Sequence, residues 1–144
     1  MGLICELNSS NIVINTIVVD DNDIINNGGY GSEEFTTWFK NNIRPFSENG
    51  VKYIDASQQV KRPSINYFYD SINNVCYEKK PYSNWTLNKN TWEWEAPVPF
   101  PSGNNTSLDQ LYTTAWDEYN QKWYYIKDNN RYNWNPSLMN WEIS

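Results

Sequence analysis

Carboxylates are the only side chains left to this 144-residue chain for enzymatic acid–base chemistry, because the sequence contains no histidine. Histidine is the commonest general base and metal ligand near neutral pH. Its absence also excludes the Ser-His and Cys-His pairs that activate a nucleophile. The sequence therefore predicts a protein that is not an enzyme, with no catalytic residue and no cofactor.

Glu93 and Glu95 form the most suggestive acid pair, since they alternate with Trp92 and Trp94. Such a pair could act as a glycosidase-like acid beside a sugar platform. Residues two apart on a strand share one face, however, so both carboxylates would point away from the indoles. The pattern favours a solvated acidic face opposite an aromatic one, and an acid-pair hydrolase remains a third hypothesis.

Metal ligands are sparse. Asp20, Asp21 and Asp23 could offer oxygen ligands to calcium, but the glycine and terminal glutamate of an EF-hand loop are missing, and a solvated acidic turn is expected. Cys5 and Cys76 are too few for a disulfide framework or a thiolate site. Two buried free thiols are expected, with a single bridge as the alternative. No metal site is predicted.

One spacing occurs four times in the second half of the chain: an aromatic residue or leucine precedes Asp or Asn, and a large ring or a cysteine follows six residues later. The flanking residues alternate between large and polar side chains, with the period of a β-strand. The alternation resumes after a turn of about four residues. The repeat predicts four β-hairpins: Tyr69-Asp70 to Cys76, Leu87-Asn88 to Trp94, Trp116-Asp117 to Trp123, and Trp134-Asn135 to Trp141.

The predicted turns carry suitable residues. Asp or Asn at the first position of a type I turn can hydrogen-bond the backbone two residues on, and Pro136 stands where such turns favour proline. Asn73 and Asn120 lie near the turn exit, where we expect a left-handed backbone. Rings that face each other across a hairpin stabilise it, although an isolated hairpin is only marginally stable in water.

The N-terminal part predicts a hairpin of two strands, Leu3–Leu7 and Ile12–Val19, joined by an Asn/Ser turn. Ser32 is expected to cap a helix that carries Glu33 and Glu34 in its first turn. Apolar residues follow at helical spacing and predict a face that packs across the hairpin: Phe35, Trp38, Phe39 and Ile43.

The connecting segments complete the predicted organisation. Asp20–Gly31 reads as a polar loop, Val51–Ile54 as a short strand, and Pro97–Pro101 as an extended, polyproline-like spacer. We expect a mainly β fold with an α+β N-terminal part. Residues 1–62 would form the hairpin and helix module, residues 63–101 the first pair of aromatic hairpins with the spacer, and residues 102–144 the second pair.

The formal net charge of −6 argues against nucleic acid and anionic membrane surfaces as partners, because affinity for both depends on lysine and arginine. No apolar run approaches the length of about 18 residues that spans a bilayer. Met1–Asn11 lacks the basic start and apolar core of a signal peptide. We therefore expect a soluble, unprocessed chain without membrane insertion.

Eight Trp and eleven Tyr supply much of the apolar surface. Such rings either build a core or a subunit interface, or they stack on sugars at a surface. The regular positions that align the rings across hairpins favour the first reading. The candidates for an interface or its supporting core are Trp116, Trp123, Trp134 and Trp141.

The order of these motifs resembles small structural proteins of tailed bacteriophages, especially marine cyanophages and their relatives. The resemblance covers most of the chain: the opening Glu6–Asp20, Tyr69-Asp70, Pro81–Asn88, Trp94–Pro101, and Trp116–Glu118 with Trp123. The central block, Pro81–Pro101, is its most specific part. The chain departs from the pattern by a fourth unit at its end, Trp134 to Trp141, and by a hydrophobic Ile72 in the first turn.

The resemblance implies a virion component that is not an enzyme, soluble in the host cytoplasm before assembly. It would attach to other virion proteins as a fibre, adaptor or surface decoration, as a homo-oligomer or in several copies. The resemblance does not distinguish head, neck, tail and fibre, and it transfers no binding residue. The alternative is a receptor-recognition module that binds host glycans through exposed Trp and Tyr.

Overall fold

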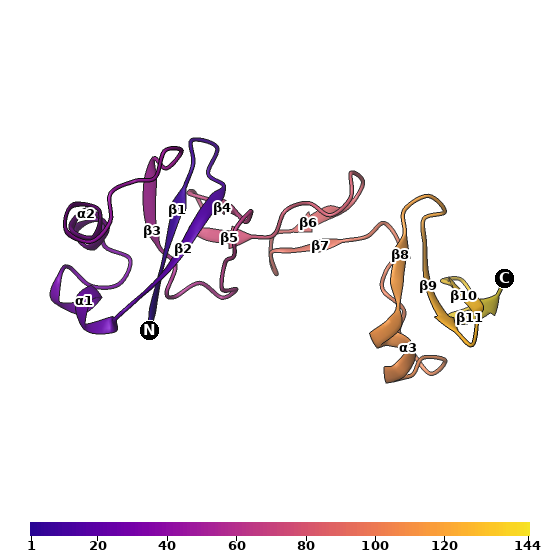
Figure 1. Ribbon diagram of the computed structural model, residues 1–144. Coiled ribbons are helices and arrows are strands. Elements are labelled where there is room, and N and C mark those ends of the chain that lie inside the picture. Colours follow the sequence, from indigo (N-terminus) through magenta and orange to yellow (C-terminus); the bar gives the residue numbers. More distant parts are fainter. The chain divides into compact units, whose positions relative to one another are not determined.

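The computed structural model describes all residues from 1 to 144 and shows a mainly β protein with eleven strands and three helices (Figure 1). The predicted fold class is confirmed. The chain divides into two compact units, Met1–Lys79 and Lys80–Ser144. The first aromatic hairpin thus belongs to the N-terminal unit, whereas the sequence pattern groups it with the second hairpin.

An antiparallel sheet of three strands forms the centre of the N-terminal unit. Strands β1 (Gly2–Leu7) and β2 (Val13–Val19) make the predicted hairpin, and β3 (Lys52–Asp55) pairs with the other side of β1. Every residue of β1 is buried, because strands flank it on both sides and both of its faces are covered. Asn8 accepts hydrogen bonds from the backbone of Ser10 and Ile12 and so fixes the β1–β2 turn.

The two faces of this sheet have different covers. Helix α2 (Glu33–Asn42) begins at its predicted cap, Ser32, and places Phe35 and Phe39 against Ile4 and Tyr53. Hairpin β4–β5 (Phe68–Asp70 and Val75–Tyr77) covers the other face. It adds Cys76 and Tyr69 to a cluster formed by Leu3, Cys5, Leu7, Val13, Ile54 and Ala56.

Helix α1 (Asp21–Asn26) lies where the sequence predicted a polar loop, so that prediction is wrong for the first half of Asp20–Gly31. Asp20 caps the helix by accepting a hydrogen bond from the backbone of Asn22, and Ile24 is fully buried. One buried aliphatic residue and a cap stabilise this short helix of about one and a half turns. It is too short to show the apolar periodicity from which a helix is predicted. Ile43, expected on the buried face of α2, ends that helix and is exposed.

All four predicted hairpins are present, and the residues quoted for each repeat face each other directly across the strands. The remaining three are β6–β7 (Thr86–Asn88 and Glu93–Glu95), β8–β9 (Ala115–Asp117 and Lys122–Lys127) and β10–β11 (Asn130–Asn135 and Asn140–Ile143). The facing pairs are Tyr69 and Cys76, Leu87 and Trp94, Trp116 and Trp123, and Trp134 and Trp141.

The turn chemistry is confirmed, with one correction. The side chain at the start of every turn accepts backbone hydrogen bonds from residues two or three positions on, as Asp70 does from Ile72 and Asn73. The left-handed residue stands four positions after the Asp or Asn, at Asn74, Trp92, Gln121 and Met139, and not at Asn73 and Asn120. Asn73 and Asn120 instead donate their side-chain amides to Asp70 and Asp117.

The last two hairpins join through β9 and β10 into one four-stranded sheet, which the sequence did not predict. Helix α3 (Leu108–Thr113) precedes this sheet and was also missed. It starts with a capping box, in which Ser107 and Gln110 bond each other's backbone. No helix of the protein is long and apolar enough to cross a membrane.

Candidate functional site

The four tryptophans predicted as interface or supporting core lie in the C-terminal unit. Trp116, Trp123 and Trp134 are 8%, 8% and 5% exposed and form one cluster, against which Trp141 and Trp85 pack. The Trp116 and Trp123 ring centroids are 4.9 Å apart and those of Trp134 and Trp141 5.1 Å apart, all in edge-to-face contact. Such contacts belong to the interior of this unit.

Trp123 is the most connected of these rings. Its indole N–H donates to the carbonyl of Val98 at 2.8 Å, and the ring of Phe100 lies 5.0 Å away. The proline-rich spacer therefore covers the hairpin. A sugar could not stack on these indoles without displacing protein. Two rings elsewhere in the unit, Tyr112 and Tyr119, are well exposed but stand alone on α3 and on a turn.

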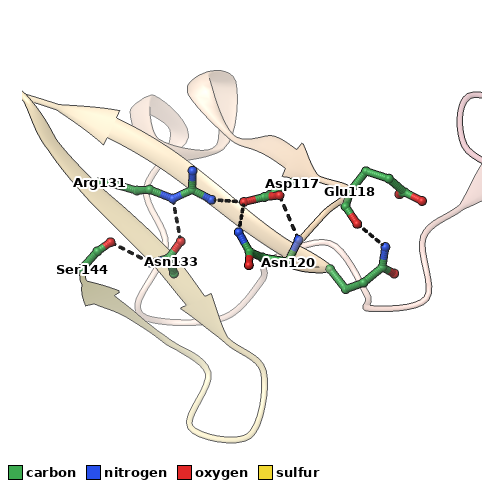
Figure 2. Close-up of polar contacts among 7 residues, drawn as sticks. Asp117, Glu118, Asn120, Arg131, Asn133 and Ser144 are labelled. Carbon is green, nitrogen blue, oxygen red and sulfur yellow. Dashed lines mark hydrogen bonds and ion pairs between the residues drawn. The ribbon is translucent and has the colours of Figure 1, made fainter.

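The opposite face of the four-stranded sheet is polar (Figure 2). Asp117 accepts hydrogen bonds from the backbone and side chain of Asn120 and pairs with Arg131. Arg131 also donates to Asn133 and lies 3.9 Å from the centroid of the Tyr124 ring. The bonds from Asn120, followed by the Arg131 charge, lower the pKa of Asp117 to about 2. These contacts tie the β8–β9 turn to β10.

The acids considered for chemistry belong to two different units of the chain. Glu93 and Glu95 are exposed on β7, and Glu95 accepts a hydrogen bond from Asn88. Asp20 caps α1, while Asp21 pairs with the N-terminal ammonium at 2.7 Å. The structure contains no group of three or more His, Cys, Asp or Glu side chains that could hold a metal ion.

Cys5 and Cys76 are free and buried in the same cluster, as expected. Burial is the largest cause that raises the pKa of the Cys5 thiol to about 12 and that of Cys76 to about 11. A thiol with such a pKa carries almost no thiolate at neutral pH, so neither cysteine is a ready nucleophile or metal ligand.

A groove with a volume of about 600 Å³ lies in the N-terminal unit. Strand β3 lies along it with all four of its residues. Helix α2 forms one wall, with Thr36, Thr37 and Lys40. Tyr69 and Asn74, from hairpin β4–β5, form the other wall. We call this site the β3 groove.

Strand β3 runs along the groove as an edge strand, because it is the last strand of its sheet and pairs only with β1. The backbone N–H of Ala56 donates to the carbonyl of Leu3, which fixes the alternation of hydrogen bonds along the pair. Ile54 and Ala56 therefore direct their peptide groups toward β1. Tyr53 and Asp55 direct theirs away from β1, into the groove.

Charged groups are separated along the β3 groove. At one end the Asp55 carboxylate accepts from the backbone N–H groups of Gly31 and Ser57, which places it beside the start of α2. Lys52 lies at the other end of the strand, with its ammonium 5.7 Å from the centroid of the Tyr69 ring. The Lys40 ammonium lies 4.7 Å from the Phe46 ring, which packs on Tyr53.

A buried carboxylate positions the loop that leads into β3. Glu6 is fully buried and accepts hydrogen bonds from the backbone and hydroxyl of Ser47 and from the amide of Asn15, at 2.7, 2.8 and 2.7 Å. Burial alone would raise the pKa of Glu6, but these bonds and the charge of Arg44 hold it below its ordinary value. A side chain at Gly50 would clash with this carboxylate, because its Cβ would overlap Oε2 of Glu6.

The sequence predicted the strand at the bottom of the β3 groove, but it did not predict the groove. Val51–Ile54 was assigned as a short strand, and nothing in its residues shows that it would be an edge or that α2 and β4–β5 would flank it. Glu6 gave a signal that could have been used, since an acidic residue inside an apolar strand is expected to need partners.

Comparison of the chain with protein-family models, with curated proteins and with solved structures finds no match.

Proposed function

We propose that the protein is an attachment protein without enzymatic activity, which binds an extended segment of another protein in the β3 groove. The resemblance of the sequence to phage structural proteins supports a virion as its location, with other virion proteins as partners. The observation that carries the proposal is the unpaired edge of β3 at the bottom of a groove with two walls.

An extended peptide can add to such an edge as a further strand. Main-chain hydrogen bonds supply affinity, while the walls select side chains on either face of the added strand. Tyr53 and Asp55 each offer a backbone donor and an acceptor at the groove side. A strand of four residues spans about 13 Å, which sets the length of the paired region.

The walls also restrict the kind of partner. Tyr69 and Asn74 stand on one side of β3, and residues of α2 stand on the other. A second copy of this chain would bring its own β3 at the bottom of an identical groove, so two such edges could not meet. A single extended segment, with no wall of its own, fits this geometry better.

The first test is selection of short random linear peptides against the folded chain, followed by measurement of affinity for synthetic versions. Each selected peptide is then N-methylated at one backbone position at a time. We expect binding to be lost at alternate positions only, because alternate N–H groups of an added strand face β3. Peptides whose binding is insensitive to N-methylation, or sensitive at consecutive positions, would contradict strand addition.

Asp55→Pro and Asp55→Ala form a matched pair for the same test. Both remove the carboxylate that holds Gly31, but only proline also removes the outward N–H of β3. We expect Asp55→Pro to bind the selected peptides more weakly than Asp55→Ala. Equal affinities in two variants with the same circular dichroism spectrum would contradict the proposal.

A further inference from the structure

We infer that the segment bound in the β3 groove carries an acidic side chain at the end of the groove where Lys40 and Lys52 lie. This inference rests on the proposed function and adds the chemistry of the partner. It starts from two lysines that reach one end of the groove from opposite walls.

The two lysines have no acidic partner within the protein. Lys40 contacts the ring of Phe46 and Lys52 the ring of Tyr69, and neither makes an ion pair. Such isolation is notable in a chain with 17 acidic and 11 basic residues, where a nearby carboxylate is easily supplied. The aromatic ring beside each ammonium also displaces water from one side of it.

The acids that line the groove lie at its other end. Glu33 precedes Lys40 by seven helical residues, which is about 10 Å along the axis of α2. Asp55 follows Lys52 by three strand residues, again about 10 Å. The bond from Gly31 to Asp55 brings the two acids to the same end, and the contact of Phe46 with Tyr53 brings the two lysines to the opposite end.

The groove thus presents two positive charges at the Lys52 end and two negative charges about 10 Å away. Side chains of an added strand alternate between the two walls, so a carboxylate at this end faces either Lys40 on the α2 wall or Lys52 on the Tyr69 wall. A basic side chain there would be repelled by the lysine that it faces. The charges therefore select the sequence of the segment, in addition to the backbone pairing.

The test compares peptides selected from the random linear library with versions in which one Asp or Glu is replaced by Asn or Gln. All peptides are amidated at the C-terminus. We expect one acidic position to be shared among the selected peptides and its neutralisation to weaken binding about fivefold at low salt, with a smaller factor at high salt. The double variant Lys40→Glu, Lys52→Glu should lose this dependence and prefer a Lys in place of the acid.

The double variant Lys122→Glu, Lys127→Glu is the charge-matched control, because both lysines are exposed on β9 in the C-terminal unit. It should retain the preference for the acid. Three results would overturn the inference: selected peptides without a shared acid, equal binding of acidic and amide versions, or binding that requires a free C-terminal carboxylate. In each of these cases alternate sensitivity to N-methylation would still support strand addition, so failure of the inference is distinguishable from failure of the proposed function.

Discussion

The N-terminal and C-terminal units contain hairpins with the same turn, yet they bury different side chains. In the N-terminal unit, Tyr69 and Cys76 of the first hairpin join a mainly aliphatic cluster from β1, β2 and the end of β3. In the C-terminal unit, the corresponding Trp116 and Trp123 pack on rings from neighbouring hairpins. The same turn forms a hairpin in both units. The residue six positions after the Asp, Cys76 or Trp123, differs in type and packs in an aliphatic or an aromatic cluster.

The two units also differ in how completely their cores are closed. Ile4 of the sheet and Phe35 and Phe39 of α2 are fully buried where the helices pack on the sheet. By contrast, Trp116, Trp123 and Trp134 keep a small exposed fraction. Helices that cross a sheet exclude water from one whole face, while short hairpins leave indole edges at the surface. Local turn chemistry thus builds the hairpins in both units, whereas packing of elements distant in sequence determines which unit has a groove.

The largest effect is expected for Trp123→Ala, which should lower the free energy of unfolding of the C-terminal unit by about 3–5 kcal/mol. The change removes contacts with Trp85, Phe100 and Trp116 and the hydrogen bond to Val98. Denaturant titration monitored by amide exchange of this unit measures it. Tyr119→Ala, at a ring 94% exposed in the same hairpin, is the control and should change stability by less than about 0.5 kcal/mol. Similar effects of both changes would refute an aromatic core.

In the N-terminal unit, Glu6→Gln should lower the free energy of unfolding by about 2 kcal/mol. The NH₂ group of the glutamine amide would face Asn15 or Ser47, which are themselves hydrogen-bond donors to Glu6. The folded pKa of Glu6 lies below its ordinary value of 4.5. Its contribution is therefore complete above pH 4.5 and is lost as the pH falls through the folded value. Urea titrations at neutral and acidic pH should show a loss of stability that is smaller in Glu6→Gln. An unchanged pH dependence would show that the buried carboxylate does not stabilise the loop before β3.

A smaller effect on stability is expected when a turn that begins with Asp is converted into one that begins with Asn. Asp117→Asn keeps an acceptor for the backbone of Asn120, as Asn135 does in the next hairpin, but it loses the ion pair with Arg131. We expect a cost of about 0.5–1 kcal/mol for Asp117→Asn and about 1–2 kcal/mol for Asp117→Ala, measured by thermal unfolding. If the two variants are equally stable, the acceptor at the start of the turn is not what stabilises the hairpin.

The smallest effect should be a gain in stability. Met139 has φ of 49°, a left-handed conformation that asparagine tolerates better than methionine. Met139→Asn should raise the free energy of unfolding of the C-terminal unit by about 0.5 kcal/mol. The same substitution at the neighbouring Leu138, which has no positive φ, should give no gain. A loss at Met139 would mean that its side-chain contacts outweigh the backbone strain.

The hairpins could be predicted because their signal is local: the Asp or Asn, the turn and the facing ring lie within seven residues of one another. Helix α2 was predicted for the same reason, from Ser32 and the spacing of Phe35 and Phe39. Helix α1 escaped because only Ile24 among its residues is buried. The left-handed position was misplaced by one residue, because Asn73 and Asn120 resemble the residues that favour that conformation, whereas Trp92 and Met139 do not.

The β3 groove could not be predicted, because it depends on the order of strands in a sheet. Lys40 and Lys52 are twelve positions apart and carry no common motif. They share one end of the groove only because α2 runs back along β3 and β3 becomes an edge. Pairing of β9 with β10 was missed for a related reason, since a repeat of hairpins does not indicate which hairpins join.

Residue-resolved amide hydrogen exchange, on the chain alone and with a selected peptide, tests most directly whether β3 is an open edge that accepts a strand. In the free protein the amides of Tyr53 and Asp55 should exchange rapidly and those of Ile54 and Ala56 slowly. Bound peptide should slow Tyr53 and Asp55. Slow exchange of these two amides in the free protein, or rapid exchange in the complex, would contradict the account.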